Sequence, residues 1–315
     1  KITEAVDITG SKPIFLVEQF GKSQIWEPFS NRFEGLYQIT RNLYKNEFGN
    51  KVMFEEVNHD LGLTFRYQWS SSNLYGFVKE STIINHNESS VTVSLVDGIQ
   101  NILPYGVGSD LQNQSSNLVD AYKRSEIEEK TGLGIFALSA IIVDKAEPSE
   151  ALKANIAWSL GLENPKYLLS SLQLKAFRNR QPIHQEVDVK AEKGAYFLNE
   201  TIELYPKEEK QWVIVTNVNQ NHSQIAELSK TIQEDNQLIN KIKENIDLGT
   251  QRLIALNGSS DGIQLTEDKF RDTRHFSNTL FNIMRGGIFD DDYTIEKADF
   301  IKYISKDSEK SCFIQ

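Results

Sequence analysis

Trp69, Tyr75 and Tyr105 are the side chains of this sequence whose type best suits the binding of a sugar. An exposed aromatic ring stacks on flat apolar surfaces, and one face of a sugar ring is such a surface. We therefore take these three residues as candidates for carbohydrate contacts. For Trp69 a core position is favoured over that interpretation, because Trp69 shares the alternating spacing of Phe65 and Tyr67.

Acidic side chains could act as the acid and base of glycoside hydrolysis, which needs two carboxyl groups that face one sugar at a fixed separation. Candidates in or beside predicted strands are Asp97, Asp120, Glu186 and Glu203. The sequence alone does not pair them across strands, and it contains no nucleophile elbow, phosphate loop or dinucleotide-binding fingerprint. No catalytic residue is therefore assigned.

Metal chemistry finds little support in the residue spacing. The three aspartates at 290–292 lack the alternating ligand positions of a calcium loop, so we interpret them as a solvated turn that caps the next helix. The five histidines are not spaced as zinc ligands, and we interpret His275 as a hydrogen-bonded packing residue. We predict neither a metal nor a cofactor.

The composition limits the classes of protein that fit. With 315 residues, 39% of them hydrophobic, the chain can form two domains with packed cores. A net charge of −10 argues against nucleic-acid binding, and the lack of a long apolar run argues against a transmembrane helix. The single cysteine, Cys312, excludes an intrachain disulfide and leaves the compartment open between cytoplasm and periplasm. Because the chain starts at Lys1, we expect either a processed protein or a fragment of a longer one.

The elements that must position these side chains begin with three predicted strands in residues 61–107. Apolar and polar residues alternate over 61–69, 77–84 and 91–95, which is the period of a half-buried strand. Residues 85–90 supply turn-forming side chains between the second and third strands. We predict an antiparallel meander here.

Further alternating segments extend the β region to residue 217. They are 135–143, 154–160, 168–177, 183–189, 195–204 and 211–218. Within this region we predict a polar loop at 109–117 and one helix at 117–130, with Asn117 as its N-cap. Many short strands at this spacing predict a mainly β fold, a large antiparallel β-sandwich (super-sandwich) followed by linker helices.

The pattern changes from a period of two to steps of three and four near residue 217. Residues 222–256 predict a long amphipathic helix with a kink at Gly249. A second helix is predicted at 267–285, ended by a glycine pair, and a short one at 295–304. We therefore divide the chain into a β-sandwich domain, 1–217, and a helical linker with the start of a helical domain, 218–315.

This order of parts resembles the inverting glycoside phosphorylases of the cellobiose and chitobiose phosphorylase group, and related glycoside hydrolases. Residues 77–85, followed by Asn87 and 91–95, resemble a recurring strand pair of that family, and residues 275–287 resemble the first helix of its catalytic barrel. In that family a super-sandwich domain is joined by linker helices to an (α/α)6 barrel that carries the catalytic acid.

The resemblance implies a non-catalytic N-terminal part of such an enzyme, because the chain stops where the barrel would begin. No catalytic residue is carried over to a position in this chain. The implied roles are to brace the barrel, to contribute to oligosaccharide binding and to supply contacts for a homodimer. Inorganic phosphate would be a co-substrate of the parent enzyme if the reaction were phosphorolysis.

Two other functions remain open. One is a free-standing carbohydrate-binding module with a helical stalk, which would need exposed aromatic residues on a sheet face. The other is a structural interaction protein whose helix at 222–256 pairs with a partner, although its apolar spacing drifts instead of keeping a strict heptad.

Overall fold

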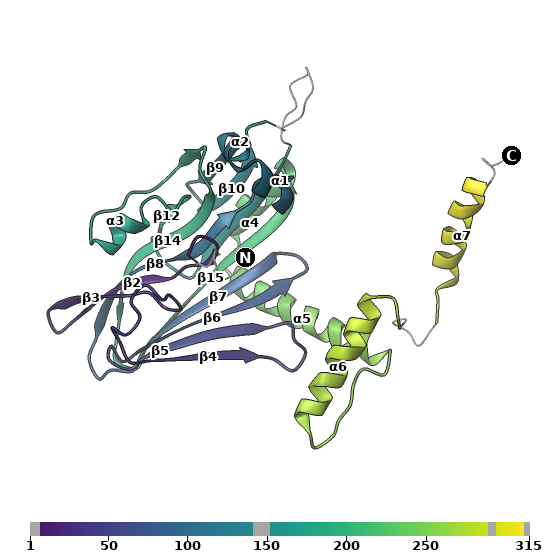
Figure 1. The fold of residues 1–315 in the computed structure, drawn as a ribbon, viewed down its shortest axis with the longest axis horizontal. Coiled ribbons are helices and arrows are strands. Elements are labelled where there is room, and N and C mark those ends of the chain that lie inside the picture. The colour runs from purple at the N-terminus through teal and green to yellow at the C-terminus, as the bar shows by residue number, and fades with distance from the viewer. Residues whose placement is uncertain (1–6, 141–151, 289–293, 312–315) are drawn as a thin grey trace. The chain divides into compact units, whose positions relative to one another are not determined.

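Two antiparallel sheets form the body of the computed structural model, which describes residues 7–140, 152–288 and 294–311 (Figure 1). The nine-stranded sheet has the order β13 (Asp188–Lys190), β9 (Lys123–Glu128), β10 (Leu133–Leu138), β11 (Lys153–Leu160), β15 (Glu209–Asn221), β7 (Gly76–Asn85), β6 (Leu63–Ser72), β5 (Val52–Asn58) and β4 (Ile39–Lys45). The six-stranded sheet has the order β12 (Lys166–Leu168), β14 (Gly194–Leu204), β8 (Val91–Ile102), β2 (Ile14–Gln19) and β3 (Lys22–Trp26), and β1 (Gly10–Ser11) pairs with β8. The predicted mainly β sandwich followed by helices is confirmed.

The core fills the space between the sheets, and the period-two pattern decides which side chains enter it. In β6, Phe65, Tyr67 and Trp69 lie on the inner face, where Phe65 is fully buried and Trp69 packs against the core while partly exposed. Because successive side chains of a strand point to opposite faces, Arg66 and Gln68 lie on the outer face. The predicted alternation of β6 is confirmed.

The predicted meander of three paired strands is wrong in its last strand. Strands β6 and β7 pair with each other in the nine-stranded sheet, but β8 belongs to the six-stranded sheet and pairs with β2 and β14. The turn at 86–90 therefore carries the chain from one sheet to the other. Alternation identifies a strand and its buried face but does not identify its neighbour.

The predicted helix at 117–130 is wrong in its second half, and the predicted loop at 109–117 contains α1 (Ser109–Gln114). Helix α2 (Ser116–Tyr122) follows Ser115, so Asn117 is not its N-cap, and the chain then enters β9. Lys123 occupies an inward position of β9, where Asp120 and Gln112 accept hydrogen bonds from its ammonium group. Because a lysine stands where an apolar residue is expected, the strand pattern was hidden.

Two other predicted strands are corrected. Residues 168–177 contain the end of β12 and then a short helix, α3 (Leu174–Arg178), whose Leu174 and Phe177 are buried. Residues 183–189 form regular strand structure only where β13 begins at Asp188. The strand predicted at 135–143 is β10, which ends at Leu138, and residues 141–143 lie outside the described part of the chain.

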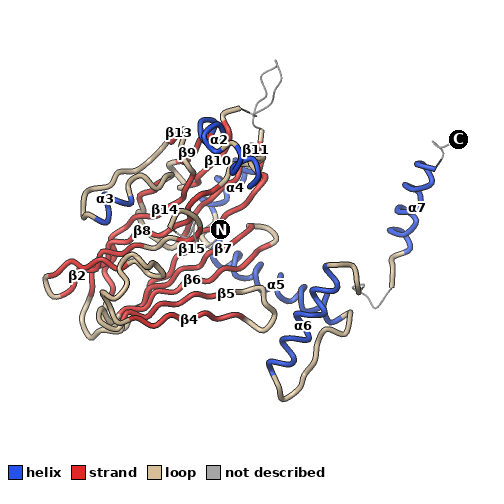
Figure 2. The backbone as a smooth tube through the Cα atoms, in the orientation of Figure 1, coloured by secondary structure: helices blue, strands red, loops and turns tan. Residues whose placement is uncertain are grey.

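The long helix predicted at 222–256 is two helices, α4 (His222–Glu234) and α5 (Leu238–Gly258). The interruption lies at 235–237, and α5 continues through Gly249. The first turns of α5 lie along the outer face of the nine-stranded sheet, where Asn245 accepts a hydrogen bond from Ser72 at 2.6 Å. Figure 2 shows α4 and the start of α5 behind the strands of this sheet.

Residues Lys45–Lys51 and Ile246–Gln315 form a compact unit separate from the sandwich. It contains α6 (Lys269–Met284) and α7 (Lys297–Ser311), so the helices predicted at 267–285 and 295–304 are confirmed. Asp268 caps α6, and Gly286 ends it with a φ of 72°, a left-handed conformation that glycine adopts without steric cost. The three aspartates at 290–292 lie outside the described residues. The predicted domain boundary at 217/218 stays a prediction.

Candidate functional site

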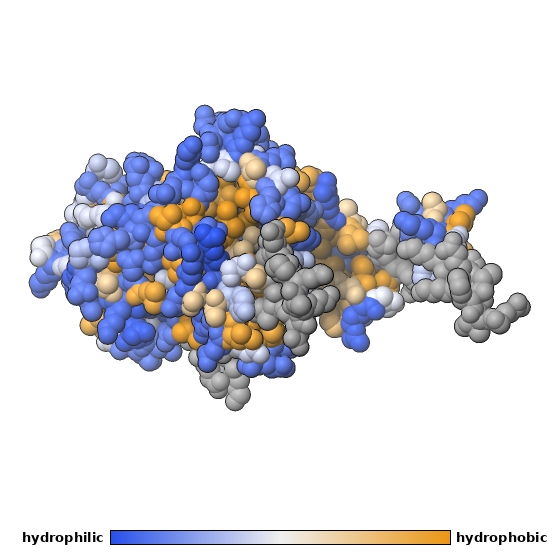
Figure 3. Space-filling model, turned by 90° about the horizontal axis from the view of Figure 1, so that it is seen from above, coloured by the Kyte–Doolittle hydropathy of each residue, from blue (hydrophilic) through white to orange (hydrophobic). Residues whose placement is uncertain are grey.

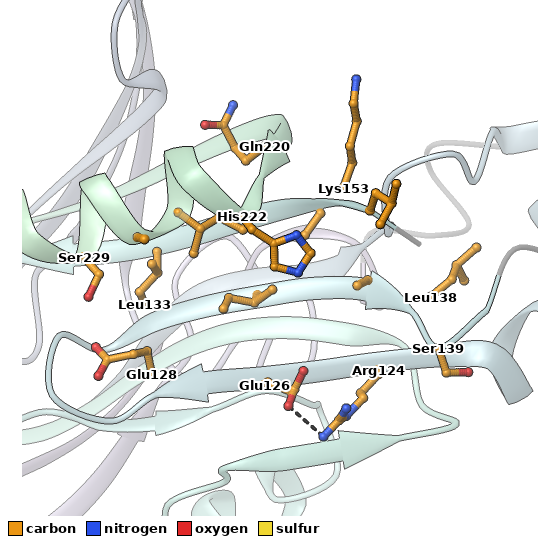
Figure 4. Close-up of a pocket in the computed structure, with 16 residues that line it drawn as sticks. Arg124, Glu126, Glu128, Leu133, Leu138, Ser139, Lys153, Gln220, His222 and Ser229 are labelled. Carbon is orange, nitrogen blue, oxygen red and sulfur yellow. Dashed lines mark ion pairs between the residues drawn. The ribbon is translucent and has the colours of Figure 1, made fainter. Parts of the chain in front are cut away.

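A cavity of about 500 Å³ lies on the outer face of the nine-stranded sheet, between its strands and helix α4. We call it the outer-face pocket. Strands β9, β10 and β11, the end of β15 and the first two turns of α4 supply its lining (Figure 4). Its volume lies within the range of small-molecule binding sites, about 300–1,000 Å³.

Strand β9 supplies the charged side of the pocket. Its inward residues alternate with Arg124, Glu126 and Glu128, which point outward and line the cavity. On the neighbouring strand β10, Leu133 and Ile135 lie opposite Glu128 and Glu126 in the register and form an apolar floor. The pocket therefore combines an apolar surface with a row of charged side chains.

Hydrogen bonds orient the guanidinium group of Arg124. Its Nε and Nη2 atoms donate to the two carboxylate oxygens of Asp188 at 3.1 and 3.2 Å, and Nη2 lies 2.7 Å from Oε1 of Glu126. The hydrogen bond to Asp188 raises the pKa of Arg124, and the same bond lowers the pKa of Asp188. Glu126 makes no other polar contact with a described residue, so one of its carboxylate oxygens is available to a ligand.

His222 lies across the pocket from this charged pair, at the start of α4 (Figure 4). The helix begins there because the side chain of Asn221 accepts a hydrogen bond from the backbone N–H of Gln224, whose own side chain accepts from the N–H of Asn221. Within the described residues the imidazole of His222 has no hydrogen-bond partner. It is therefore free to donate a hydrogen bond to a ligand or to accept one.

This arrangement suits a small neutral ligand that has one apolar face and several hydroxyl groups. Carboxylate, imidazole and guanidinium groups bond to hydroxyls, and the floor of β10 packs against the apolar face. In the described part of the chain, no three histidine, cysteine, aspartate or glutamate side chains come together as metal ligands would. The pocket thus offers a ligand both hydrogen-bonding groups and an apolar surface.

The three aromatic residues singled out in the sequence lie apart from one another. Trp69 is on the inner face of β6. Tyr75 follows β6 and packs edge-on against Trp158, with ring centroids 6.4 Å apart. Tyr105 follows β8 and lies 5.3 Å from the ammonium group of Lys153, a residue that lines the outer-face pocket. Only Tyr105 is thus brought near this pocket, and the part of each residue in sugar binding stays a prediction.

The sequence reasoning missed Glu126 and His222 as site residues. The signal for Glu126 is the alternation of charged residues over 124–128, which lies within the helix that we predicted at 117–130. The signal for His222 was weaker, because a histidine after a capping asparagine is common at the start of a helix. Neither residue could be placed opposite the other without knowing that α4 folds back over β9 and β10.

No protein-family model matches this chain, and no curated protein matches it in sequence. Among solved structures, a bacterial glucoamylase complexed with acarbose has a TM-score of 0.48 at 10% identity, covering 87% of this chain and 35% of that chain. A polysaccharide lyase has a TM-score of 0.38 at 12% identity, covering 70% of this chain and 27% of that one. A putative kojibiose phosphorylase from the human microbiome has a TM-score of 0.38 at 9% identity, covering 86% and 27%. The chain spans about a third of the length of the glucoamylase and about a quarter of the other two.

Proposed function

We propose that this chain is the non-catalytic β-sandwich and linker-helix part of a carbohydrate-active enzyme of the glycoside phosphorylase or hydrolase type. Its work is to brace an (α/α)6 catalytic barrel in the same polypeptide and to hold part of an oligosaccharide. The order of a two-sheet sandwich and then helices supports this proposal. The observation that carries it is the exposed apolar surface of the last two helices.

Helices α6 and α7 expose large apolar side chains. In α7, Phe300, Ile301 and Ile304 are each about half exposed and Tyr303 is 68% exposed. Their spacing of one, three and four residues places them on one stripe of the helix. In α6, Met284 is 70% exposed, and Figure 3 shows hydrophobic side chains among hydrophilic ones on the helical part of the chain. A contiguous apolar stripe of this kind marks a surface that another element covers.

A helical domain of the same polypeptide is the occupant that this surface fits best. An apolar stripe on a helix packs readily against another helix, which supplies the complementary ridges and grooves. In this proposal the catalytic acid belongs to the barrel, and the present chain carries no catalytic residue. The parent enzyme then needs no bound cofactor, and inorganic phosphate is its co-substrate if the reaction is phosphorolysis.

The proposal that this chain supports a barrel domain of the same polypeptide can be tested by reading the coding sequence beyond the codon of Gln315. About 400 or more residues with helical periodicity, the scale of a large barrel domain, are expected there. A stop codon or a β-rich sequence directly after Gln315 would overturn the proposal. An independent assay follows glycoside cleavage by the purified chain, with and without phosphate, and measurable turnover would refute its non-catalytic role.

The outer-face pocket supplies the oligosaccharide contact in this proposal. Titration calorimetry with oligosaccharides should detect binding, and Glu126→Gln and His222→Ala should each weaken it by about tenfold, the cost of one hydrogen bond to a charged or buried partner. Glu129→Gln is the matched control, because Glu129 is exposed nearby and does not line the pocket. No heat of binding at about 10 mM saccharide, or equal losses in all three variants, would remove the pocket from the proposal.

Light scattering separates these roles from the two alternatives. A free-standing carbohydrate-binding module predicts a monomer that binds sugars and whose coding sequence ends near Gln315. A structural interaction protein, or a homodimer built on α6 and α7, predicts a mass that rises with concentration and falls when Phe300 and Tyr303 are replaced by serine, because the exposed stripe is then less apolar.

A further inference from the structure

A second cavity, of about 300 Å³, lies beside helix α3 and shares no lining residue with the outer-face pocket. We call it the α3 pocket. The end of β8 lines it with Gln100 and Asn101, and α3 and the turn before it line it with Ser171, Lys175 and Arg178. Residues from the turn before β14 and from the N-terminal region complete it.

The α3 pocket is basic in a chain whose net charge is −10. Its lining contains four basic side chains, Arg32, Lys175, Arg178 and Lys193, and two acidic ones, Asp7 and Glu192. Lys175 and Lys193 are exposed and form no ion pair with any described residue. Two cations without partners at one cavity attract an anion.

Arg178 is held rigidly in this wall. Its Nε and Nη2 atoms each donate to a carboxylate oxygen of Glu27 at 2.9 Å, and the side chain of Glu27 is fully buried. The ammonium group of Lys12 also lies 2.9 Å from Glu27. Burial raises the pKa of Glu27, but the hydrogen bonds from Arg178 and Lys12 outweigh burial and hold that pKa below its usual value. Nε of Arg32, another lining residue, lies 3.7 Å from the same carboxylate. One carboxylate is thus shared by three cations, so the wall keeps a net positive charge.

Two amide side chains of the pocket have polar atoms without partners. Nε2 of Gln100, a residue only 3% exposed, and Oδ1 of Asn101 are buried and form no hydrogen bond within the described residues. The backbone of Asn101 has a φ of 55°, a left-handed conformation that is uncommon outside glycine. Buried polar groups are nearly always paired, so a donor and an acceptor left without partners in the lining of one pocket indicate a missing ligand or water.

We propose that the α3 pocket binds a monosaccharide phosphate. Lys175, Lys193 and Arg32 neutralise the phosphate, and the free amide groups of Gln100 and Asn101 bond to sugar hydroxyls, which both donate and accept. An anion that carries hydroxyl groups would pair with the exposed lysines and also bond to the unpaired amide atoms. An ordered water would bond only to the amide atoms. This assignment does not depend on the function proposed above.

Titration calorimetry on the full chain tests it with a hexose 6-phosphate, inorganic phosphate and the unphosphorylated hexose as probes. The hexose phosphate should bind more tightly than either of the other two, and its affinity should fall as salt is added. The double variant Lys175→Gln/Lys193→Gln should lose about a hundredfold in affinity, because each charge-assisted hydrogen bond contributes roughly tenfold or more.

The variant Lys22→Gln/Lys130→Gln is the matched control, because both lysines are exposed and lie outside the α3 pocket while the net charge changes equally. Gln100→Met should weaken hexose phosphate binding without weakening that of inorganic phosphate. No binding at about 10 mM hexose phosphate would overturn the proposal, as would equal losses in the two double variants. Equal affinity for inorganic phosphate would overturn the assignment of a sugar ligand.

Discussion

Asp97 and Lys79 form an ion pair inside the sandwich and join its two sheets. Nζ of Lys79 lies 2.5 Å from Oδ1 of Asp97, and neither side chain is exposed. Oδ2 of Asp97 accepts hydrogen bonds from Ser81 at 2.9 Å and from the indole N–H of Trp212 at 2.8 Å. The ammonium group also lies 5.1 Å from the centroid of the Tyr67 ring. Every polar group of this cluster therefore has a partner.

Removing one partner of this ion pair should destabilise the protein strongly, whereas replacing both partners should change its stability little. At a separation of 2.5 Å and an effective dielectric constant of about 20, the attraction is about 7 kcal/mol. Burying each ion costs several kcal/mol, so the net contribution of the pair is close to zero, whereas removing one partner costs about 3–5 kcal/mol. Burial lowers the pKa of Lys79, and the charge and hydrogen bond of Asp97 oppose that shift. Without the carboxylate the buried ammonium group is left uncompensated.

We expect Asp97→Asn to lower the free energy of unfolding by about 3–5 kcal/mol. Lys79→Met should cost less, because Ser81 and Trp212 still donate to the carboxylate. The double variant Lys79→Met/Asp97→Asn should fall within about 2 kcal/mol of the unsubstituted protein, because the amide oxygen keeps an acceptor for both donors. The four tryptophans lie in β3, β6, β11 and β15, so their fluorescence during urea unfolding reports on the sandwich.

Glu80→Gln is the matched control for this cycle. Glu80 follows Lys79 in β7, points to the outer face, and its carboxylate lies 3.9 Å from the ammonium group of Lys243. A partly exposed pair of this kind contributes about 1 kcal/mol or less. The reasoning fails if Asp97→Asn costs no more than the control, or if the two single effects add in the double variant.

Three shorter predictions concern acid, base and backbone strain. The pKa of Glu27 is held below its usual value of 4.5. The carboxylate therefore contributes to the free energy of unfolding above that pH, and this contribution is lost as the pH falls through the lowered pKa. In denaturant titrations the difference in free energy of unfolding between Glu27→Gln and the unsubstituted protein should shrink in acid. Burial raises the pKa of Tyr67 to about 12, from a usual value of 10.0, so the stability of the protein should fall between these values because only the unfolded state ionises there; Tyr67→Phe should remove that part of the loss. Gly132→Ala should lower the free energy of unfolding by about 2–3 kcal/mol, because Gly132 has a φ of 69° and a Cβ would lie 2.1 Å from the Tyr167 hydroxyl oxygen. The control is Gly106→Ala, because Gly106 also has a positive φ, 83°, but a Cβ there would meet no atom within 4 Å. This control should lower the free energy of unfolding by about 1 kcal/mol in the same assay.

Strand existence could be predicted from residue alternation, and strand neighbours could not. The inner face of β6 followed directly from the spacing of Phe65, Tyr67 and Trp69. The same alternation continued through β8, which nevertheless belongs to the other sheet. Alternation records which side of a strand is buried, and both sheets of a sandwich bury the same kind of side chain in one core.

The candidate site was hidden for a related reason. The residues KRSEIE form β9, in which a buried lysine and a buried serine take positions that an apolar residue usually occupies. Pairing with β10 and β13 outweighed the helical preference of this segment. Arg124 and Glu126 therefore fell within the helix predicted at 117–130, although they belong to a strand and line a pocket.

Sequence alone determined the mainly β class, the change to helices after the last strand, and the alternating faces, because these depend on local periodicity and local turn chemistry. Tertiary structure decided the crossing of β8 into the six-stranded sheet, the packing of α4 over β9 and β10, and the burial of Lys79 against Asp97. Each of these joins residues distant in the chain, and their free energy comes from contacts that no local pattern records.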